Sequence, residues 1–314
     1  MNWPLVAAAA TGVQVGAAIV ASRFAVAEVP PFTLAMLRYA IGFGCLLPFA
    51  WRGTREALRQ PAGPTVHSSR TGDLLAMAAL GIGQFGILIA LLNFGLQHVG
   101  AAQAALIFSL FPLLTLLLAA ALGRERATLL LAMGVLLSIA GVALMLAPKL
   151  GSPQPGHWWG ELAVAASAAT GALCSVLYRP YLRRYPTVAV SAFAMLASVL
   201  FLALLAGGEH WPSRVAGFSA AAWTAIVFIG VSSGIGYFWW LYALKHESPT
   251  RVTVFLGLNP LTAALLGWGL LNEPLPATAL GALALTVSGL WLATRSPASR
   301  EDHRDRDGFT GGAR

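Results

Sequence analysis

The sequence predicts an all-α integral membrane protein of ten transmembrane helices, arranged as two inverted repeats of five helices each. First, hydrophobic residues make up 57% and charged residues 10% of the 314, whereas soluble domains are roughly a quarter charged. Second, apolar runs recur along the chain, and roughly 20 such residues cross a hydrocarbon core as a helix. Third, the segment from Leu96 to Pro148 aligns without a gap to the sequence 148 positions later, with matching His, Pro and Glu residues.

The internal repeat sets the expected architecture. At an offset of 148, the residues Leu96, His98, Pro112 and Glu125 align with Leu244, His246, Pro260 and Glu273. Earlier spans align at an offset of 156, so the first half holds extra residues, which we place in the loop at 52–72. Two tandem copies with an odd number of helices must enter the membrane from opposite sides. The repeats are therefore inverted, a build that is typical of secondary transporters.

Ten spans divide the chain into two repeats. The first repeat covers residues 1–147, with spans at about 4–22, 31–50, 74–96, 101–122 and 128–147. A linker at 148–157 leads to the second repeat, residues 158–295, with spans at about 158–178, 187–206, 219–243, 251–271 and 277–294. Residues 296–314 are charged and Gly-rich, and they are predicted to be a disordered cytoplasmic tail.

The arrangement of basic residues predicts the orientation. Most of the 20 lysines and arginines lie after spans two, four, six and eight or in the tail. By the positive-inside rule, both termini are then cytoplasmic, with Arg23 as the one charge against this assignment. The net charge of +8 is explained by orientation, because the arginines lie in short gaps and form no basic face for nucleic acid.

Polar positions on one face of the sixth span align with positions of the first. They are Ser167, Thr170, Cys174 and Tyr178, opposite Thr11, Gln14, Ala18 and Ser22. Such a pair of stripes either lines a central pathway or joins packed helices through hydroxyl hydrogen bonds. For the hydroxyls both interpretations stay open, whereas the larger Gln14 and Tyr178 favour the pathway.

Amides and aromatic residues add candidates in other spans. Gln84 and Asn93 lie in the third span, Gln103 in the fourth and Asn259 in the ninth. A buried amide can bond substrate or a neighbouring backbone, and we favour the pathway. Aromatic residues around Trp239 either pack in the core and anchor at the interface or line a cavity for organic solutes.

The duplicated prolines Pro112 and Pro260 each leave a carbonyl one turn earlier without its helical donor, which predicts a kink or swivel. Small residues along the ninth span suit either close packing or the rocking of one bundle against another.

Few charged residues lie within spans. Arg38 does, at a cost of roughly 3 kcal/mol unless it is paired, and its partner is either structural or a substrate carboxylate. Glu125 and Glu273 end spans four and nine, where we expect each to cap the next helix. Because no acid lies deep in a span, gradient-driven movement without a carboxylate proton relay is the simpler mechanism. His98 and His246 are weaker candidates for proton coupling.

Other motifs exclude several classes of protein. Gly81 to Gly86 matches GxGxxG, but it lacks the preceding strand and the following acid of a dinucleotide site, so these glycines are expected to allow close packing. Because Cys45 and Cys174 each lie inside an apolar run, they suggest neither a disulfide framework nor a metal site. No metal site, cofactor or catalytic residue is predicted.

Taken together, these elements resemble the drug/metabolite transporter superfamily, its EamA family and, within it, the YddG-like exporters. The matching elements are Pro31 with Arg38, Phe111-Pro112, Asn259-Pro260, Asn272-Glu273-Pro274-Leu275 and Ser288-Gly289. The resemblance implies two inverted EamA repeats, cytoplasmic termini, and a cavity lined by spans one, three, four, six, eight and nine through which small metabolites are exported.

The resulting prediction is a monomeric exporter of the bacterial inner membrane, working by alternating access on amino acids or related zwitterionic or cationic solutes. The expected substrate contacts are Gln14, Arg38, Gln84, Asn93, Gln103, Tyr178, Trp239 and Asn259, and the expected hinges are Pro112 and Pro260. Its partners are the substrate and the lipid bilayer, not nucleic acid. Three alternatives remain: an enzyme acting on lipid-linked substrates, a scaffold or sensor subunit, and a purine or nucleotide-sugar carrier.

Overall fold

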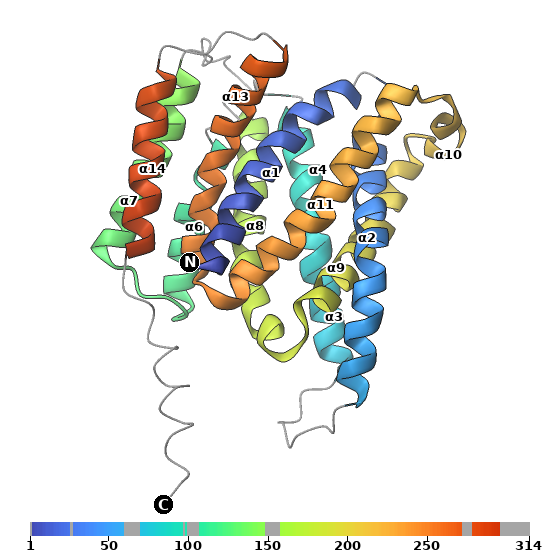
Figure 1. Cartoon of the computed structure of the whole chain (residues 1–314), viewed down its shortest axis with the longest axis horizontal. Coiled ribbons are helices and arrows are strands. Elements are labelled where there is room, and N and C mark those ends of the chain that lie inside the picture. The colour runs from blue at the N-terminus through green and yellow to red at the C-terminus, as the bar shows by residue number, and fades with distance from the viewer. Residues whose placement is uncertain are drawn as a thin grey trace, which may run out of the picture.

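The computed structural model describes residues 2–25, 28–59, 70–96, 98, 107–147, 158–271 and 278–295. Figure 1 shows a bundle of helices, and all regular structure within these ranges is helical. The first half contains α1 (Trp3–Ala25), α2 (Pro31–Arg59), α3 (Arg70–Gly81), the π-helix η1 (Ile82–Ile87), α4 (Leu88–Leu96), α6 (Phe111–Ala121) and α7 (Leu129–Leu146).

The second half has its five spans in the same order, with two short helices added between the second and third of them. It contains α8 (Trp158–Arg184), α9 (Thr187–Gly207), α10 (Trp211–Arg214), the 3-10 helix η3 (Val215–Gly217), α11 (Ala220–His246), α12 (Pro249–Val254), the 3-10 helix η4 (Phe255–Gly257), α13 (Leu258–Leu271) and α14 (Ala279–Arg295). The third span of the sequence is thus α3, η1 and α4 in succession. The ninth span is α12, η4 and α13.

The helices have the length and surface of membrane spans. Within the described ranges, seven helical segments are long and apolar enough to cross a membrane, and α6, α7 and α14 are shorter apolar helices. Large apolar side chains point outward, including Leu129, Leu204 and Leu280, which are about four-fifths exposed (78%, 80% and 81%). Surfaces of this kind are stable against lipid rather than water. The ten segments follow the order that the sequence predicts.

The packing of the helices has the two-fold relation that inverted repeats require. The helices α7 and α14 pack against each other, as do α2 and α9, and each of these pairs joins equivalent spans of the two halves. In the first half α1 packs against α11 and α13, and in the second half α8 packs against α4 and α6. Exchanging the halves therefore reproduces the same set of neighbours, which confirms the predicted architecture.

Close contact between α7 and α14 depends on small residues. A Cβ atom on Gly289 would lie 2.6 Å from the Gly134 carbonyl oxygen, and one on Gly134 would lie 2.7 Å from the Gly289 carbonyl oxygen. The equivalent contact joins Gly141 to Ala282, because a Cβ on Gly141 would lie 2.8 Å from the Ala282 carbonyl oxygen. Small residues let two helix backbones meet at this distance in a membrane.

The sixth span continues past the point where its sequence predicts an end. A boundary near residue 178 was expected, yet α8 runs to Arg184 through Pro180. Pro180 cannot donate to the carbonyl of Val176, four residues earlier. That carbonyl instead accepts a hydrogen bond of 2.9 Å from Nη1 of Arg124, which follows α6. A side chain from the other repeat thus satisfies the carbonyl that the proline leaves without a donor.

Glu125 caps a different helix from the one that the sequence predicts. It was expected to cap the next helix, α7, but Thr128 already caps that helix by accepting from the Leu131 amide at 3.2 Å. The buried carboxylate of Glu125 instead accepts from the Thr250 hydroxyl at 2.7 Å and from the Thr250 amide at 3.3 Å. It therefore caps α12 in the other repeat. Glu273, its equivalent, lies outside the described residues.

Two further acids join the repeats at the opposite end of the bundle. The Glu28 carboxylate accepts from the amide and hydroxyl of Ser219, the N-cap of α11, at 2.9 and 2.8 Å. Glu209 accepts from the amides of Phe32 and Thr33 in the first turn of α2, at 3.0 and 2.7 Å. Carboxylates at helix N-termini are stabilised by the unpaired amides and the helix dipole.

Both duplicated prolines lie just after an interruption in a helix. Residues 107–108 are helical, a turn follows at 109–110, and α6 starts at Phe111 with Pro112 in its first turn. In the ninth span the 3-10 helix η4 separates α12 from α13, whose third residue is Pro260. Proline is well tolerated in a first turn, where its missing amide has no helical partner to lose.

Candidate functional site

The third span is irregular at its centre, and Gln84 lies in the irregular segment. In η1 the Leu88 amide bonds the Gly83 carbonyl five residues earlier, which defines a π-helix. Segments of this kind are frequent at functional sites. The Oε1 atom of Gln84 is buried, and it has no hydrogen-bond partner among the residues that the structure describes. An unpartnered polar atom inside a membrane protein is costly unless something else bonds it.

The equivalent position in the second repeat holds a serine, and its hydroxyl accepts a hydrogen bond from an amide side chain of the first repeat. Ser232 corresponds to Gln84 at an offset of 148, and Gln14 corresponds to Thr170 at an offset of 156. The Gln14 Nε2 atom donates to the Ser232 hydroxyl at 3.2 Å. In the other half the Thr170 hydroxyl bonds the Ala166 carbonyl of its own helix. The bond that holds Gln14 is therefore not repeated for Gln84.

Two further buried polar atoms lie on the second-repeat spans that are predicted to line the pathway. Within the part of the chain that the structure describes, the Asn259 Oδ1 and Trp240 Nε1 atoms also have no hydrogen-bond partner. Asn259 lies at the start of α13, directly after η4. The sequence named Trp239 as the contact in α11; Trp239 is half-buried, whereas the indole of Trp240 holds the buried donor.

An aromatic cluster joins four spans beside Gln84. The Phe85 ring lies 4.5 Å from that of Tyr39 in α2 and 4.4 Å, edge to face, from that of Tyr237 in α11. The Tyr237 hydroxyl donates to the Tyr178 hydroxyl in α8 at 2.8 Å. Tyr178 is fully buried. The cluster places Phe85 and the π-helix between both halves of the protein.

Arg38 has a structural contact. Its Nε atom donates to the Ser233 hydroxyl of α11 at 2.6 Å, and its guanidinium lies 5.3 Å from the centroid of the Tyr39 ring. Of the remaining predicted residues, Asn93 is half-buried in α4, and Gln103 lies outside the described residues.

Two hydroxyls of the predicted polar stripes, one in each repeat, join packed helices. The Thr11 hydroxyl donates to the Gly236 carbonyl of α11 at 3.2 Å, and the Ser167 hydroxyl donates to the Leu88 carbonyl of α4 at 2.8 Å. The other two Ser and Thr hydroxyls of the stripes, those of Thr170 and Ser22, bond carbonyls of their own helices, at Ala166 and Ala18. For Thr11 and Ser167 the contacts match helix association, whereas for Thr170 and Ser22 both interpretations stay open.

The two aligned histidines make the same local contacts at the ends of their spans. The Nδ1 atom of His98 lies 2.9 Å from the Phe94 carbonyl, and that of His246 lies 2.8 Å from the Tyr242 carbonyl. Because a carbonyl only accepts, Nδ1 holds the proton in both rings. Each imidazole also contacts the aromatic ring of that same residue in a tilted arrangement, with ring centroids 4.6 and 4.4 Å apart.

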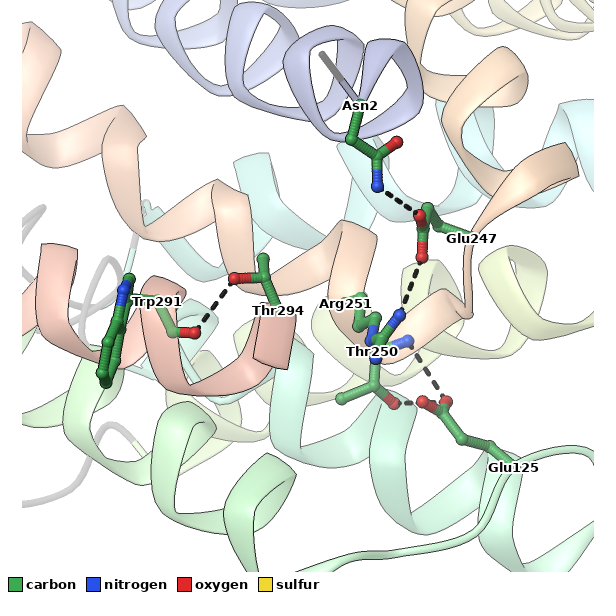
Figure 2. A network of polar contacts seen from close by, with 7 residues as sticks. All are labelled: Asn2, Glu125, Glu247, Thr250, Arg251, Trp291 and Thr294. Carbon is green, nitrogen blue, oxygen red and sulfur yellow. Dashed lines mark hydrogen bonds and ion pairs between the residues drawn. The ribbon is translucent and has the colours of Figure 1, made fainter. Parts of the chain in front are cut away.

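A polar network lies at the end of the bundle where α1 begins and α14 ends. Figure 2 shows Glu247, after α11, accepting from Asn2 at 3.0 Å and pairing with Arg251 of α12 at 3.1 Å. The bond between Glu125 and Thr250 lies beside it. These contacts link α1, α11, α12 and the segment after α6. Sequence periodicity gave no signal for this network, because its members come from separate loops and helix ends.

An all-helical bundle of two inverted halves, with buried amides near the middle of its spans, is the architecture of secondary transporters. The match to a family model narrows this class. The EamA-like transporter family model matches residues 2–147 and 158–295. The chain belongs to the EamA-like transporter family, and it is a multi-pass membrane transporter rather than an enzyme.

Relatives of known name are similar over most of the chain. A probable terminal-alkyne amino-acid exporter of Streptantibioticus cattleyicolor is 31% identical over 78% of this chain and 81% of its own length. The aromatic amino acid exporter YddG of Ancylobacter novellus is 30% identical over 85% of this chain and 88% of its own. An uncharacterized transporter of Archaeoglobus fulgidus is 27% identical over 89% of this chain and 94% of its own length.

A solved structure shows the same fold. It is a crystal structure with a TM-score of 0.76 and 24% sequence identity, and the similarity covers 93% of this chain and 96% of that one.

Proposed function

We propose that the protein exports small organic solutes, amino acids or related zwitterionic or cationic metabolites, across the inner membrane by alternating access. Two relatives that are about 30% identical to this chain are named as amino-acid exporters. The arginine-rich loop ends favour an orientation in which both termini face the cytoplasm. One bundle of ten spans holds both repeats, so a monomer is sufficient for the mechanism.

The observation that carries the proposal is the Gln84 Oε1 atom in the π-helix of the third span, which is buried and has no hydrogen-bond partner within the described ranges. At the equivalent position of the second repeat, the Ser232 hydroxyl accepts a hydrogen bond from Gln14. The repeated fold therefore does not require an unsatisfied polar group at this position. A substrate that supplies a donor to Gln84 would remove the cost of the buried oxygen.

The chemistry of the buried groups favours zwitterionic or weakly cationic solutes. Three of the buried atoms without a hydrogen-bond partner among the described residues, Gln84 Oε1, Asn259 Oδ1 and Trp240 Nε1, belong to uncharged side chains on the spans that are expected to line the pathway. An amide presents an acceptor oxygen and donor hydrogens, so two amides can bond an ammonium and a carboxylate of the same solute. Because the Nε atom of Arg38 donates to Ser233, the structure supports a structural role for Arg38 more than a phosphate-binding, nucleotide-sugar site.

For the transport cycle, we assign the bending to the interruptions before Pro112 and Pro260. Each lies between shorter helical pieces, where few helical hydrogen bonds oppose a change of angle. The contacts of Glu247 and Glu125 hold one end of the bundle closed. In the alternate state these contacts separate, and the opposite end closes.

The test is solute flux into liposomes that hold the purified protein, with labelled amino acids, purines and organic cations, each measured with and without a pH gradient. The proposal expects saturable flux of an amino acid or cationic solute without the gradient. Flux that requires the gradient would restore proton coupling and direct attention to His98 and His246. Absence of flux for every solute would contradict the proposal.

A further inference from the structure

An apolar groove lies on the outer surface, between the first turns of α1 and the last turns of α14. It has a volume of about 380 Å³, and its walls include Leu5, Val6, Ala9, Phe255, Leu290 and Trp291. The walls come from both repeats, because α1 belongs to the first, whereas η4 and α14 belong to the second. The groove is distinct from the buried amides of the candidate substrate site.

The groove exists because α1 is in close contact with its neighbours one to two turns further along. A Cβ atom on Gly12 would overlap the Phe255 carbonyl oxygen of η4, and one on Gly16 would lie 2.7 Å from the Asn259 carbonyl oxygen. Before Gly12 no glycine lines α1, and the small side chain of Ala9 leaves space towards α14. The cleft is therefore a fixed consequence of how α1 packs.

The groove lies on the apolar outer surface of the bundle, where helices of a membrane protein are expected to meet lipid. Val6, Val287 and Trp291, which line it, are 41%, 50% and 52% exposed on the protein surface. In a bilayer such a groove is filled by a lipid chain, because an empty apolar space loses the dispersion contacts of its lining atoms.

A cation is fixed at one end of the groove. Arg295, the last residue of α14, places its guanidinium carbon 3.9 Å from the centroid of the Trp291 ring, which is part of the groove wall. Figure 2 shows the Trp291 ring beside the last turn of α14, with the Thr294 hydroxyl bonded to the Trp291 carbonyl at 3.0 Å. A stacked guanidinium still presents its planar edge to a phosphate, which it can bind through two parallel hydrogen bonds.

We propose that this groove binds an anionic phospholipid of the arginine-rich side of the membrane, with one acyl chain in the groove and the phosphate on Arg295. Apolar walls and a terminal cation in one continuous site match the two parts of such a lipid. Attraction of an anionic head group to basic residues at the membrane surface supplies the selectivity. The bound chain touches α1 and η4 together, so its presence couples lipid composition to the relative position of the two repeats.

The test measures the unfolding temperature of the full-length protein in detergent during titration with phosphatidylglycerol or with phosphatidylcholine of the same acyl chains. A ligand that binds the folded protein raises the transition in a saturable way. Wild type is expected to respond to phosphatidylglycerol at lower concentration. Arg295→Gln should weaken that response about fivefold, as expected for one basic residue at the surface. Arg214→Gln, an exposed arginine of α10 outside the groove, is the matched control and should leave it unchanged.

Two variants test the acyl-chain part. Ala9→Phe fills the groove from α1, and Val287→Phe fills it from the exposed face of α14, where added volume leaves the core intact. Both are expected to reduce the response to both lipids. Equal responses of wild type to the two lipids, or an unchanged response in Arg295→Gln, would overturn the proposal. So would a dimer in detergent that Val287→Phe dissociates, because a second copy would then occupy the groove.

Discussion

Thr11 and Ser167, which are 156 positions apart, donate equivalent hydrogen bonds in the two halves of the protein. Thr11 bonds the carbonyl of Gly236, and Ser167 bonds the carbonyl of Leu88. These two acceptors are 148 positions apart, which is the offset of the later spans. The duplication in the sequence thus extends to individual contacts between helices. Gln84 departs from this symmetry, and we therefore place it at the centre of the proposed site.

Removing either of these equivalent hydroxyls should have a similar effect on stability. Thr11→Val and Ser167→Ala each remove one hydrogen bond between helices, for which we expect a loss of about 0.6 kcal/mol. Unfolding in mixed micelles measures the change. Thr224→Val is the control, because the Thr224 hydroxyl bonds only within its own helix at an exposed position. A loss in one variant without a comparable loss in the other would contradict their equivalence.

Gln84→Leu should separate transport from stability. The substitution removes a buried oxygen without a partner among the described residues, so folding stability should be unchanged or slightly raised. Solute flux should fall, by up to about tenfold for one lost hydrogen bond to substrate. Gln14→Leu is the matched comparison, because it breaks the bond to Ser232 and should lower stability. Unchanged flux kinetics in Gln84→Leu would remove Gln84 from the site.

Arg124 and Pro180 should be coupled through the Val176 carbonyl. Arg124→Ala leaves that carbonyl without its donor and should destabilise the protein by about 1.5–3 kcal/mol, as for hydrogen bonds to charged groups. In a Pro180→Ala background the new amide at position 180 donates to Val176, so the loss should be smaller. Arg126→Ala, at an exposed neighbouring position, is the control. Equal losses in both backgrounds would show that the bond to Val176 does not explain the effect of Arg124.

Weakening the network at Glu247 should favour opening at its end of the bundle. Glu247 and Arg251 have side chains that are 13% and 12% exposed, so their ion pair is screened less than a surface pair. Replacing both by alanine removes the link between α1 and α12 without leaving an unpaired charge. We expect thiol labelling of the bundle interior from that side to increase. Thr250→Val, which removes the hydroxyl bond to Glu125, should act in the same direction.

The contact between Glu28 and Ser219 should respond to acid. The amide and then the hydroxyl of Ser219 lower the pKa of Glu28 below its ordinary value of 4.5. A lowered pKa contributes stability that is present above pH 4.5 and is lost as the pH falls through the folded-state value. Glu28→Ala should therefore lower the unfolding temperature at pH 7, and the difference from wild type should vanish below the lowered pKa. A difference that persists there would contradict the assignment.

The sequence predicted the architecture well because membrane spans and duplication are local or periodic signals. The order of the ten spans and the inverted relation of the halves both follow from hydropathy and alignment. The glycines of Gly81 to Gly86 were expected to allow close packing, and a Cβ on Gly83 would indeed lie 2.8 Å from the sulfur of Cys174. The π-helix in the same segment was not predicted, because it is defined by hydrogen-bond register rather than by composition.

The features that the sequence did not predict depend on contacts between residues far apart in the chain. The end of α8 was placed too early because the partner of the Val176 carbonyl, Arg124, lies 52 positions away. The partner of Glu125, Thr250, lies 125 positions away in the other repeat. The bond between Gln14 and Ser232 spans 218 positions. No periodicity reports such pairs, so sequence reasoning could name the polar side chains but could not say which of them were already bonded.

Thiol labelling of a single cysteine at position 84 tests alternating access most directly. Cys45 and Cys174 are the two native cysteines, so Gln84→Cys is placed in a Cys45→Ser, Cys174→Ala background in oriented vesicles. A membrane-impermeant reagent is then applied from either side, with and without a transported solute. We expect labelling from both sides, with the ratio changed by the solute. Labelling from neither side, or from one side regardless of solute, would contradict it.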